Sequence, residues 1–454
     1  MRSVHRAKIA GLCALLAGAS AETARAQYVP YGPFDAYPNS QLREGPGFKV
    51  LGDGLVIHPG IATELGYDSN MLMSAQAGGA GVLRLRAHVD IATRPPQRLD
   101  VDSRQFLKFR FGAAVEYRQF FSRDARIGYP QQVNAQSDAD LRIKDGDPLS
   151  FRLYNQFLVT NDARNLEVAT TQTFAPRIFE RLSLLGMYRP FGGPLEIGLS
   201  ESLRVDHYVQ SELSRGRSFQ NDIALWGAYK MLPQTQLKLE VRSSWTSFYG
   251  DGAVIPNSAP LRITGGIQSL LFPWLGASLY VGYGNSLHYG LFDTTQLVGD
   301  TSSYRYNNFV GGLEARLLLV PRMNLRAGWA RDFFDSIYAT YLRDDRLYVA
   351  YEHNPWRSLW LSAGFETYLR VYGPLVAPST LYYRAYKNGA TTRSDTLFAL
   401  NVDASYRPLS WLQAGVSYNL LADVTDFGFV DGAGTRMDAG FLKHVVLFKA
   451  DLSY

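Results

Sequence analysis

From Leu55 to the last residue, apolar and polar side chains alternate along the chain with a period of two. In the first such stretch Ile61, Leu65 and Tyr67 share one face, and His58 and Glu64 lie on the other. Successive side chains of a β-strand point to opposite sides of its sheet, so the pattern predicts strands with one apolar and one polar face. We count about 18 such stretches. They begin near residues 55, 82, 107, 133, 149, 174, 195, 221, 237, 261, 277, 307, 324, 346, 358, 397, 411 and 442.

The connections between these stretches alternate between short and long. Short ones include residues 145–147, 191–193, 272–274, 321–322, 354–355 and 408–409. Long ones include residues 68–81, 119–132, 160–173, 284–306, 369–393 and 420–440. Outer-membrane barrels have short periplasmic turns and long extracellular loops, so we expect an all-β fold, a transmembrane antiparallel up-and-down β-barrel of about 18 strands. Residues 93–105, a long connection on the periplasmic side, depart from this arrangement.

Aromatic residues occur on the apolar face at both ends of the stretches. The outer ends carry Tyr67, Tyr117, Phe157, Trp245, Tyr283, Trp329, Phe365 and Tyr418, and the inner ends carry Tyr188, Tyr229, Tyr351, Tyr406 and Tyr454. Girdles of this kind mark the two membrane interfaces of an outer-membrane barrel. A soluble β-sandwich would explain neither the girdles nor the alternating connections. A helical membrane protein is excluded, because no run of roughly 20 apolar residues follows the N-terminal region.

Residues 1–26 have the features of a secretion signal. Arg2, Arg6 and Lys8 precede an apolar stretch at residues 9–19, and Ala-Arg-Ala at residues 24–26 is a typical cleavage pattern. We therefore expect a signal peptide at 1–26, a short periplasmic segment at 27–54 and the barrel at 55–454, in the outer membrane of a Gram-negative bacterium. Cys13, the one cysteine, lies within the signal, so the mature chain has no thiol for a disulfide, a metal site or catalysis.

The polar face should line the lumen, because a barrel of about 18 strands is wide enough for an aqueous channel. The lumen-lining residues predicted are Arg84, Arg86, Asp90, Lys108, Arg110, Glu116, Arg142, Arg152, Arg204, Asp206, Lys238, Glu240, Arg242, Glu314, Arg316, Arg326, Glu352 and Asp403. Mixed charges of this kind tune pore selectivity, and they also pair across the wall and stabilise it. Inward aromatic residues, which either stack on sugar rings or fill space, are Tyr154, Tyr208, Tyr280, Trp360 and Tyr368.

Other classes of function have little support. The net charge of +5 is small and spread along the chain, so we expect no nucleic-acid partner. The histidines show no spacing for a catalytic pair, and we expect no catalytic residues, no cofactor and no metal. Acidic residues at 423–432 lack the spacing of an EF-hand, which leaves a solvated loop as the simpler interpretation. Residues 27–54 are too few for the plug domain of an energy-coupled transporter.

The last strand ends in an aromatic residue. Phe448, Leu452 and Tyr454 share its apolar face, which is typical of the signal read by the barrel assembly machinery. We therefore expect these three residues to direct assembly into the outer-membrane lipid.

Several short motifs resemble the β-barrel porin 2 family. The sequence GLVIHPG at residues 54–60 and LGYDSN at residues 65–70 are similar to the opening of that family, as are the Tyr-Arg-Pro strand ends at 188–190 and 406–408. The resemblance covers about residues 50–454 and implies a porin-like barrel of the outer membrane. Some relatives are associated with polysaccharide secretion, in which a periplasmic polysaccharide export protein would supply the inner conduit. A diffusion porin for small hydrophilic solutes and a surface adhesion barrel stay open as alternatives.

Three polar residues interrupt the apolar face of neighbouring stretches. They are Asn155, Glu180 and Glu201, and their positions predict that they point outward near the middle of the membrane. One interpretation is a lateral interface with a homo-oligomer or another partner. The other is a local slip of register that turns one of the three inward.

Overall fold

The computed structural model describes most of the chain from residue 47 onward. The described residues are 47–50, 54–93, 106–124, 127, 131–144, 147–161, 176–210, 216–249, 256–289, 297–298, 304–320, 322–336, 339–356, 358–376, 383–384, 393–430 and 436–454. The predicted signal peptide at residues 1–26 and most of the predicted segment at 27–54 lie outside these ranges. Within them, no helix is long and apolar enough to cross a membrane.

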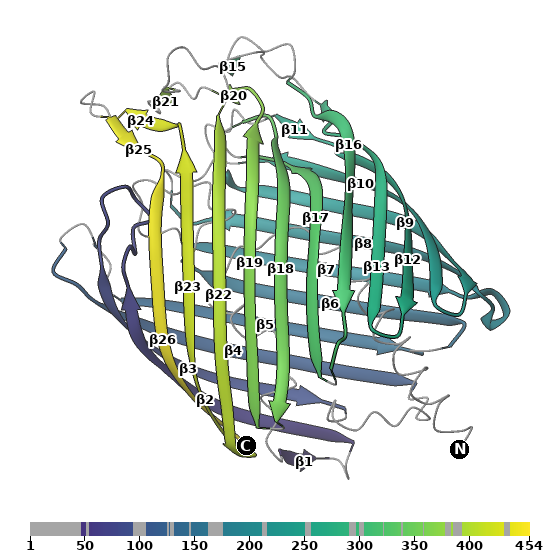
Figure 1. Cartoon of the computed structure of the whole chain (residues 1–454), viewed down its shortest axis with the longest axis horizontal. Helices are drawn as coiled ribbons and strands as arrows, with labels where there is room; N and C mark the ends of the chain where they lie inside the picture. Colours follow the sequence, from purple (N-terminus) through teal and green to yellow (C-terminus); the bar gives the residue numbers. More distant parts are fainter. Residues whose placement is uncertain are drawn as a thin grey trace.

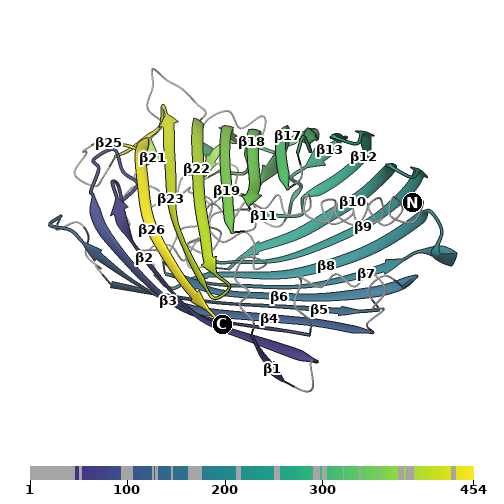
Figure 2. The same ribbon diagram turned by 60° about the horizontal axis from the view of Figure 1, so that its bottom comes forward.

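Eighteen long strands form one antiparallel barrel (Figure 1). They are β2 (Leu55–Asp68), β3 (Ala80–Ala92), β4 (Leu107–Phe121), β5 (Gln131–Ile143), β6 (Leu149–Thr160), β7 (Arg177–Tyr188), β8 (Leu195–Tyr208), β9 (Ser218–Leu232), β10 (Thr235–Phe248), β12 (Leu261–Phe272), β13 (Leu275–Asn285), β16 (Asn307–Leu317), β17 (Met323–Phe334), β18 (Leu342–Trp356), β19 (Leu359–Tyr372), β22 (Ser394–Leu409), β23 (Leu412–Thr425) and β26 (Phe441–Ser453). Each pairs with the next, and β2 pairs with β26 from Gly60–Ser453 to Asp68–Val445, which closes the barrel. Figure 2 shows the sheet curving round until these two strands lie side by side.

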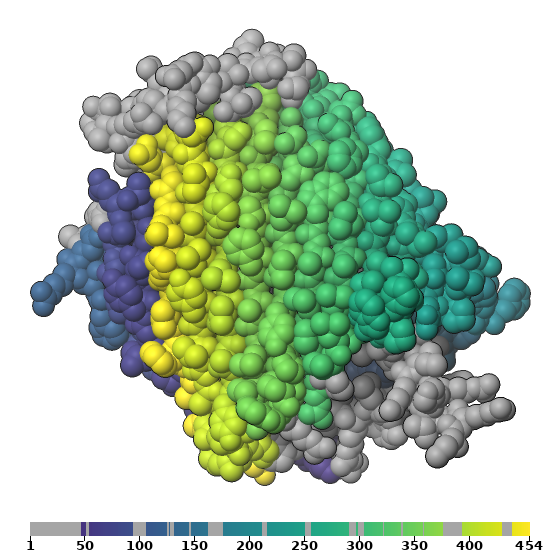
Figure 3. Space-filling model, viewed as in Figure 1, coloured from purple at the N-terminus to yellow at the C-terminus, as the bar shows by residue number. Residues whose placement is uncertain are grey.

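The burial pattern along the strands shows why the sequence closes in this way. On β2, Ile61 is 61% exposed, whereas the next residue, Ala62, is 2% exposed. The apolar set points to the outside of the barrel, where lipid would cover it, and the polar set points inward. Figure 3 shows the outer wall formed by the later strands as a continuous surface.

The predicted fold class is confirmed, and the predicted strand starts lie close to the observed ones. The largest difference is at β18, which begins at Leu342 rather than near residue 346. Here the strand continues past the apolar band, and Arg343 and Asp345 occupy its outward positions. Alternation of apolar and polar residues therefore ends before the hydrogen-bonded ladder does.

Short strands occur outside the regular barrel ladder. They are β1 (Phe48–Val50), β11 (Asn257–Ser258), β14 (His288–Tyr289), β15 (Leu297–Val298), β20 (Leu375–Val376), β21 (Tyr383–Arg384), β24 (Gly428–Val430) and β25 (Arg436–Asp438). β15 pairs with β20, and β21, β24 and β25 form a separate small sheet. These five short strands, β15, β20, β21, β24 and β25, lie in extracellular loops, at the top of Figure 1. These loops therefore carry secondary structure that the alternation pattern did not predict.

The seam between β2 and β26 includes the start of the described chain. β1 pairs with Leu55–Ile57 at the inner end of β2, on the edge that β26 occupies farther along. The rings of Phe48 and Tyr454 lie 4.6 Å apart between centroids. β1 therefore continues the line of β26 beyond the C-terminus and covers the strand edge that would otherwise be left open.

We expect deletion of Tyr454 to lower the amount of assembled barrel. The deletion removes the terminal aromatic of the predicted assembly signal and the ring contact with Phe48. The measurement is the fraction of outer-membrane protein that migrates faster on gels when unheated than when boiled. Tyr406→Ala is the matched control, because Tyr406 is 51% exposed against 48% for Tyr454 but lies away from the terminus. Equal losses in both variants would assign the effect to the girdle rather than to the terminus.

Candidate functional site

The inner wall of the barrel carries the charged residues expected for a lumen. Arg84, Arg86 and Asp90 occupy the inward positions of β3, opposite inward residues of β2 and β4. The other residues of the predicted set also lie at inward positions: Lys108, Arg110, Glu116, Arg142, Arg152, Arg204, Asp206, Lys238, Glu240, Arg242, Glu314, Arg316, Arg326, Glu352 and Asp403. The wall around the interior is thus polar and carries both signs of charge.

Several arginines face another arginine directly across the ladder. The pairs are Arg84–Arg118, Arg142–Arg152, Arg181–Arg204, Arg242–Arg262 and Arg316–Arg326. Like charges directly opposite each other destabilise a sheet. The arrangement recurs at five places around the inner wall.

Carboxylates lie beside four of these arginine pairs and offset part of the repulsion. Asp140 is the clearest case, with oxygens 2.8 Å from nitrogens of both Arg142 and Arg152. Similar contacts join Arg84 to Glu64 at 3.1 Å, Arg242 to Glu240 at 2.8 Å, Arg262 to Asp332 at 2.8 Å and Arg326 to Glu352 at 3.6 Å. The inward charges therefore pair within strands, as Arg242 does with Glu240, and between neighbouring strands, as Arg84 does with Glu64.

We expect Asp140→Asn to make the pore more selective for anions. The change removes the one carboxylate that bridges Arg142 and Arg152 and keeps the shape of the side chain. The measurement is the reversal potential across a planar bilayer under a salt gradient. Asp345→Asn is the control, because Asp345 pairs with Arg331 and Arg343 at the outer end of the wall, at outward positions. Equal shifts in both variants would contradict a lumenal origin.

Flat aromatic rings lie against the inner wall above glycines. The ring of Tyr280 covers Gly312, where a Cβ would lie 2.7 Å from it, and that of Tyr348 covers Gly328 at a similar distance. Tyr348 also donates a hydrogen bond to Glu314 at 2.6 Å. Each ring covers a glycine of the neighbouring strand, so the contact depends on the register between the two strands. Sequence reasoning had no access to that register and did not single out Tyr348.

For the five inward aromatic residues the sequence left two roles open, stacking on sugar rings and filling space, and two of them are placed where they cannot stack. Tyr208 is 1% exposed and Tyr368 is 2% exposed, so neither presents a ring face to the interior. Tyr154, Tyr280 and Trp360 are partly exposed at inward positions. The two buried rings fill space beneath neighbouring side chains instead, as Arg346 and Arg370 near Tyr368 illustrate.

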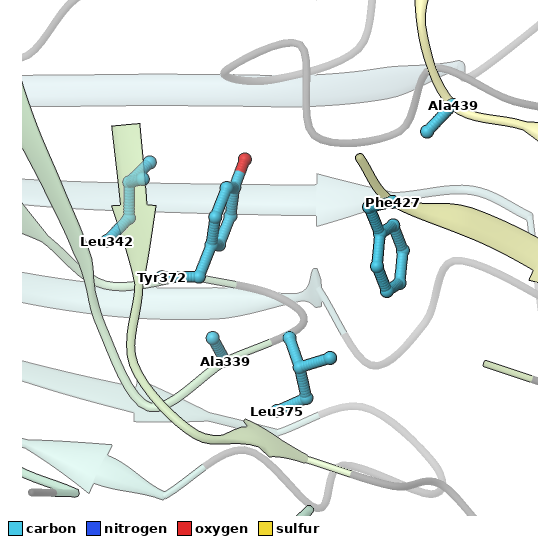
Figure 4. Close-up of a cluster of buried hydrophobic side chains, with 6 residues drawn as sticks. All are labelled: Ala339, Leu342, Tyr372, Leu375, Phe427 and Ala439. Atoms are coloured by element: carbon cyan, nitrogen blue, oxygen red, sulfur yellow. The ribbon is translucent and has the colours of Figure 1, made fainter. Parts of the chain in front are cut away.

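Extracellular loops pack into apolar clusters at the outer mouth. One cluster of described residues comes from β18, β19, the loops beside them and the connection between β23 and β26 (Figure 4). Its members are Ala339, Leu342, Tyr372, Leu375, Phe427 and Ala439. The Arg393 guanidinium lies 4.4 Å from the ring centre of Tyr372 and 4.8 Å from that of Phe427. It also pairs with Asp395 at 2.6 Å. Burial lowers the pKa of Arg393, but Tyr372 and Asp395 raise it by more, so the side chain remains cationic.

Two further clusters pack loop residues against the inner wall. Met71 and Ile127, from the loops after β2 and β4, cover the inward-facing Val82 and Phe120. On the far side of the barrel, Tyr306, Val310 and Phe333 form a second cluster with Tyr341 beside it. Inward-facing residues at the outer end of the wall are thus covered by the protein's own loops.

The contacts of the described histidines and acidic residues are those of the barrel wall and its loops. His88 contacts Asp451 at 3.2 Å, as part of the lumen network. Asp423, at the start of the acidic stretch considered for calcium, faces inward from β23. In the part of the chain that the structure describes, no group of three His, Cys, Asp or Glu side chains is arranged to hold a metal ion.

The remaining predicted residues lie on the outside of the barrel. Phe448, Leu452 and Tyr454 face outward from the last strand and the final residue, and all three are exposed. Asn155, Glu180 and Glu201 also face outward, and the register carries no shift near them. The slip of register considered above is therefore not observed.

Comparison with known proteins assigns no family. No protein-family model matches the chain, and no curated protein matches its sequence. The expected membership of the β-barrel porin 2 family thus has no support from family models.

Solved structures of outer-membrane proteins resemble the chain distantly. OpdK from Pseudomonas aeruginosa shares 9% identity at a TM-score of 0.43, covering 88% of this chain and 99% of its own. OccAB4 from Acinetobacter baumannii shares 8% sequence identity at a TM-score of 0.44, and the match covers 92% of this chain and 100% of OccAB4. A bacterial polysaccharide outer membrane secretin shares 11% sequence identity at a TM-score of 0.34, and the match covers 88% of this chain and 97% of the secretin. These low similarities assign no function. The closed barrel, its apolar exterior and its polar interior make the chain a porin-like protein of the bacterial outer membrane.

Proposed function

We propose that this protein is a diffusion pore for small hydrophilic solutes. The observation that carries the proposal is the packing of extracellular loops at the outer mouth, where Leu342, Tyr372 and Phe427 are buried with loop residues. Loops fixed against the inner wall narrow the passage through a barrel whose width would otherwise be set by its strands. A narrowed, charged passage suits single small molecules.

Secretion of a polysaccharide, the function expected from the sequence resemblance, fits this mouth less well. A growing polymer needs an opening that stays wide while the chain moves through it. Three apolar clusters tie loops to the wall near β3 and β4, near β16 and β17, and near β18 and β19. A periplasmic export partner accordingly forms no part of the proposal.

The arginine pairs of the lumen favour anionic solutes among the small molecules. Five cross-strand pairs lie at inward positions around the wall, each close to other polar groups. Positive charge lining a pore lowers the electrostatic barrier for an anion and raises it for a cation.

The test combines reconstituted protein with a deletion strain. Liposomes containing the full chain should swell in small sugars and small organic acids but not in long oligosaccharides. A strain lacking the gene should keep its surface polysaccharide and take up small anions more slowly. Loss of surface polysaccharide in the deletion strain, with no permeability in liposomes, would overturn the proposal in favour of secretion.

A further inference from the structure

A polar patch crosses the exterior of four neighbouring strands, β6 to β9. It consists of Asn155, Glu180, Glu201 and Asn221, one on each strand, and all four occupy outward positions. The Asn155 amide donates a hydrogen bond to Glu180 at 3.5 Å, and the Asn221 amide donates one to Glu201 at 3.4 Å. Both glutamates are exposed. Asn221 belongs to this β6–β9 patch although the sequence pattern had not singled it out.

The patch runs from within the apolar band to its outer edge, because Asn155 lies inside the band and Asn221 lies opposite Trp245 of the outer girdle. Leu149, Phe151 and Leu153 lie on the inner side of Asn155, and Phe157 lies on its outer side. Each two-residue step along a strand tilted near 40° climbs about 5 Å, so three steps place Asn155 roughly 15 Å above the inner interface. The apolar band of such a barrel is about 25 Å tall. Lipid chains would offer the polar groups inside the band no hydrogen-bonding partner.

We propose that the β6–β9 wall is the contact surface for a second copy of this chain. Copies inserted in the same direction are related by an axis along the membrane normal, and a two-fold axis makes each surface meet itself. If that axis passes through the contact between Asn221 and Glu201, each amide lies beside the carboxylate of the other copy. The two Asn221 amides and the two Glu201 carboxylates, one of each from each copy, then alternate as donor and acceptor.

This arrangement satisfies groups that one copy leaves incomplete. Each Asn amide has two N–H donors and uses one in these two hydrogen bonds, and each carboxylate has two oxygens and uses one there. A symmetric contact supplies the matching group without bringing in a basic residue. It also removes the glutamates from lipid.

The test places a single cysteine beside the patch. The one natural cysteine, Cys13, lies in the predicted signal, so the mature chain offers a clean background. Ile223, directly opposite Glu201 in the ladder, is changed to Cys. Val416→Cys is the matched control, an exposed aliphatic position on β23, far round the barrel. Outer membranes are treated with a short bis-maleimide cross-linker.

We expect Ile223→Cys, and not Val416→Cys, to give a species of twice the chain mass. Adding Glu201→Leu or Asn221→Leu should reduce that species severalfold while the barrel stays heat-modifiable, because leucine at either position is compatible with lipid. Three results would overturn the proposal: equal cross-linking at both cysteines, no doubled species at Ile223→Cys, or an adduct whose mass shows a different protein. The last would indicate a partner with a basic side chain.

Discussion

Replacing Arg393 with alanine should widen the outer mouth and raise the single-channel conductance severalfold. The guanidinium lies over two aromatic rings, that of Tyr372 at the end of β19 and that of Phe427 in the connection after β23, and it pairs with Asp395. Removing one partner of a buried ion pair costs about 3–5 kcal/mol, because the other charge is left buried without compensation. Loss of the ring contacts adds about 1–2 kcal/mol. These losses fall on the loops and leave the barrel ladder intact.

The measurement is conductance in planar bilayers, together with the largest sugar that swells proteoliposomes. Arg305→Ala is the control, because Arg305 also lies over a ring, that of Tyr304 at 4.9 Å, but its side chain is exposed. We expect the control to conduct as the parent does. A conductance for Arg393→Ala equal to that of the parent would show that the loop cluster does not limit the passage, and would remove the main support for a small-solute pore.

The strands and their faces could be predicted from the sequence because the alternation of apolar and polar residues within each strand shows which side chains face lipid. Because side chains alternate with a period of two, a shift of one residue would turn every side chain of a strand to the opposite face, so the apolar residues fix the orientation of the whole strand. Asn155 and Glu201 were therefore assigned to the outside correctly. The same reasoning placed Asp140 and Arg142 on one inward face.

Partners from other strands could not be predicted, because they depend on register. Arg152 reaches Asp140 only through the pairing of β5 with β6, and Tyr348 covers Gly328 only through that of β17 with β18. The apolar clusters formed by the loops could not be predicted either. Phe427 meets Leu375 and its other neighbours from separate loops, and no period marks residues that pack irregularly.

Replacing Gly66 with valine should lower the stability of the barrel by about 3 kcal/mol or more, at the upper end of what overpacking costs. Gly66 faces Leu447 where β2 meets β26, and a Cβ there would overlap the backbone carbonyl oxygen of Val446. Backbone atoms cannot turn aside as a flexible side chain can, so the ladder that closes the barrel must open locally.

The measurement is the urea midpoint for loss of the heat-modifiable form in detergent. Gly227→Val is the matched control: Gly227 lies in the middle of the β8–β9 ladder, and a Cβ there meets nothing within 4 Å. Valine at that position adds an apolar group and favours the strand conformation. We therefore expect its midpoint to equal or exceed that of the parent. Equal losses from the two substitutions would mean that glycine matters for backbone freedom in any strand, whereas a loss confined to Gly66→Val shows that the close approach of the two backbones at the β2–β26 seam requires glycine there.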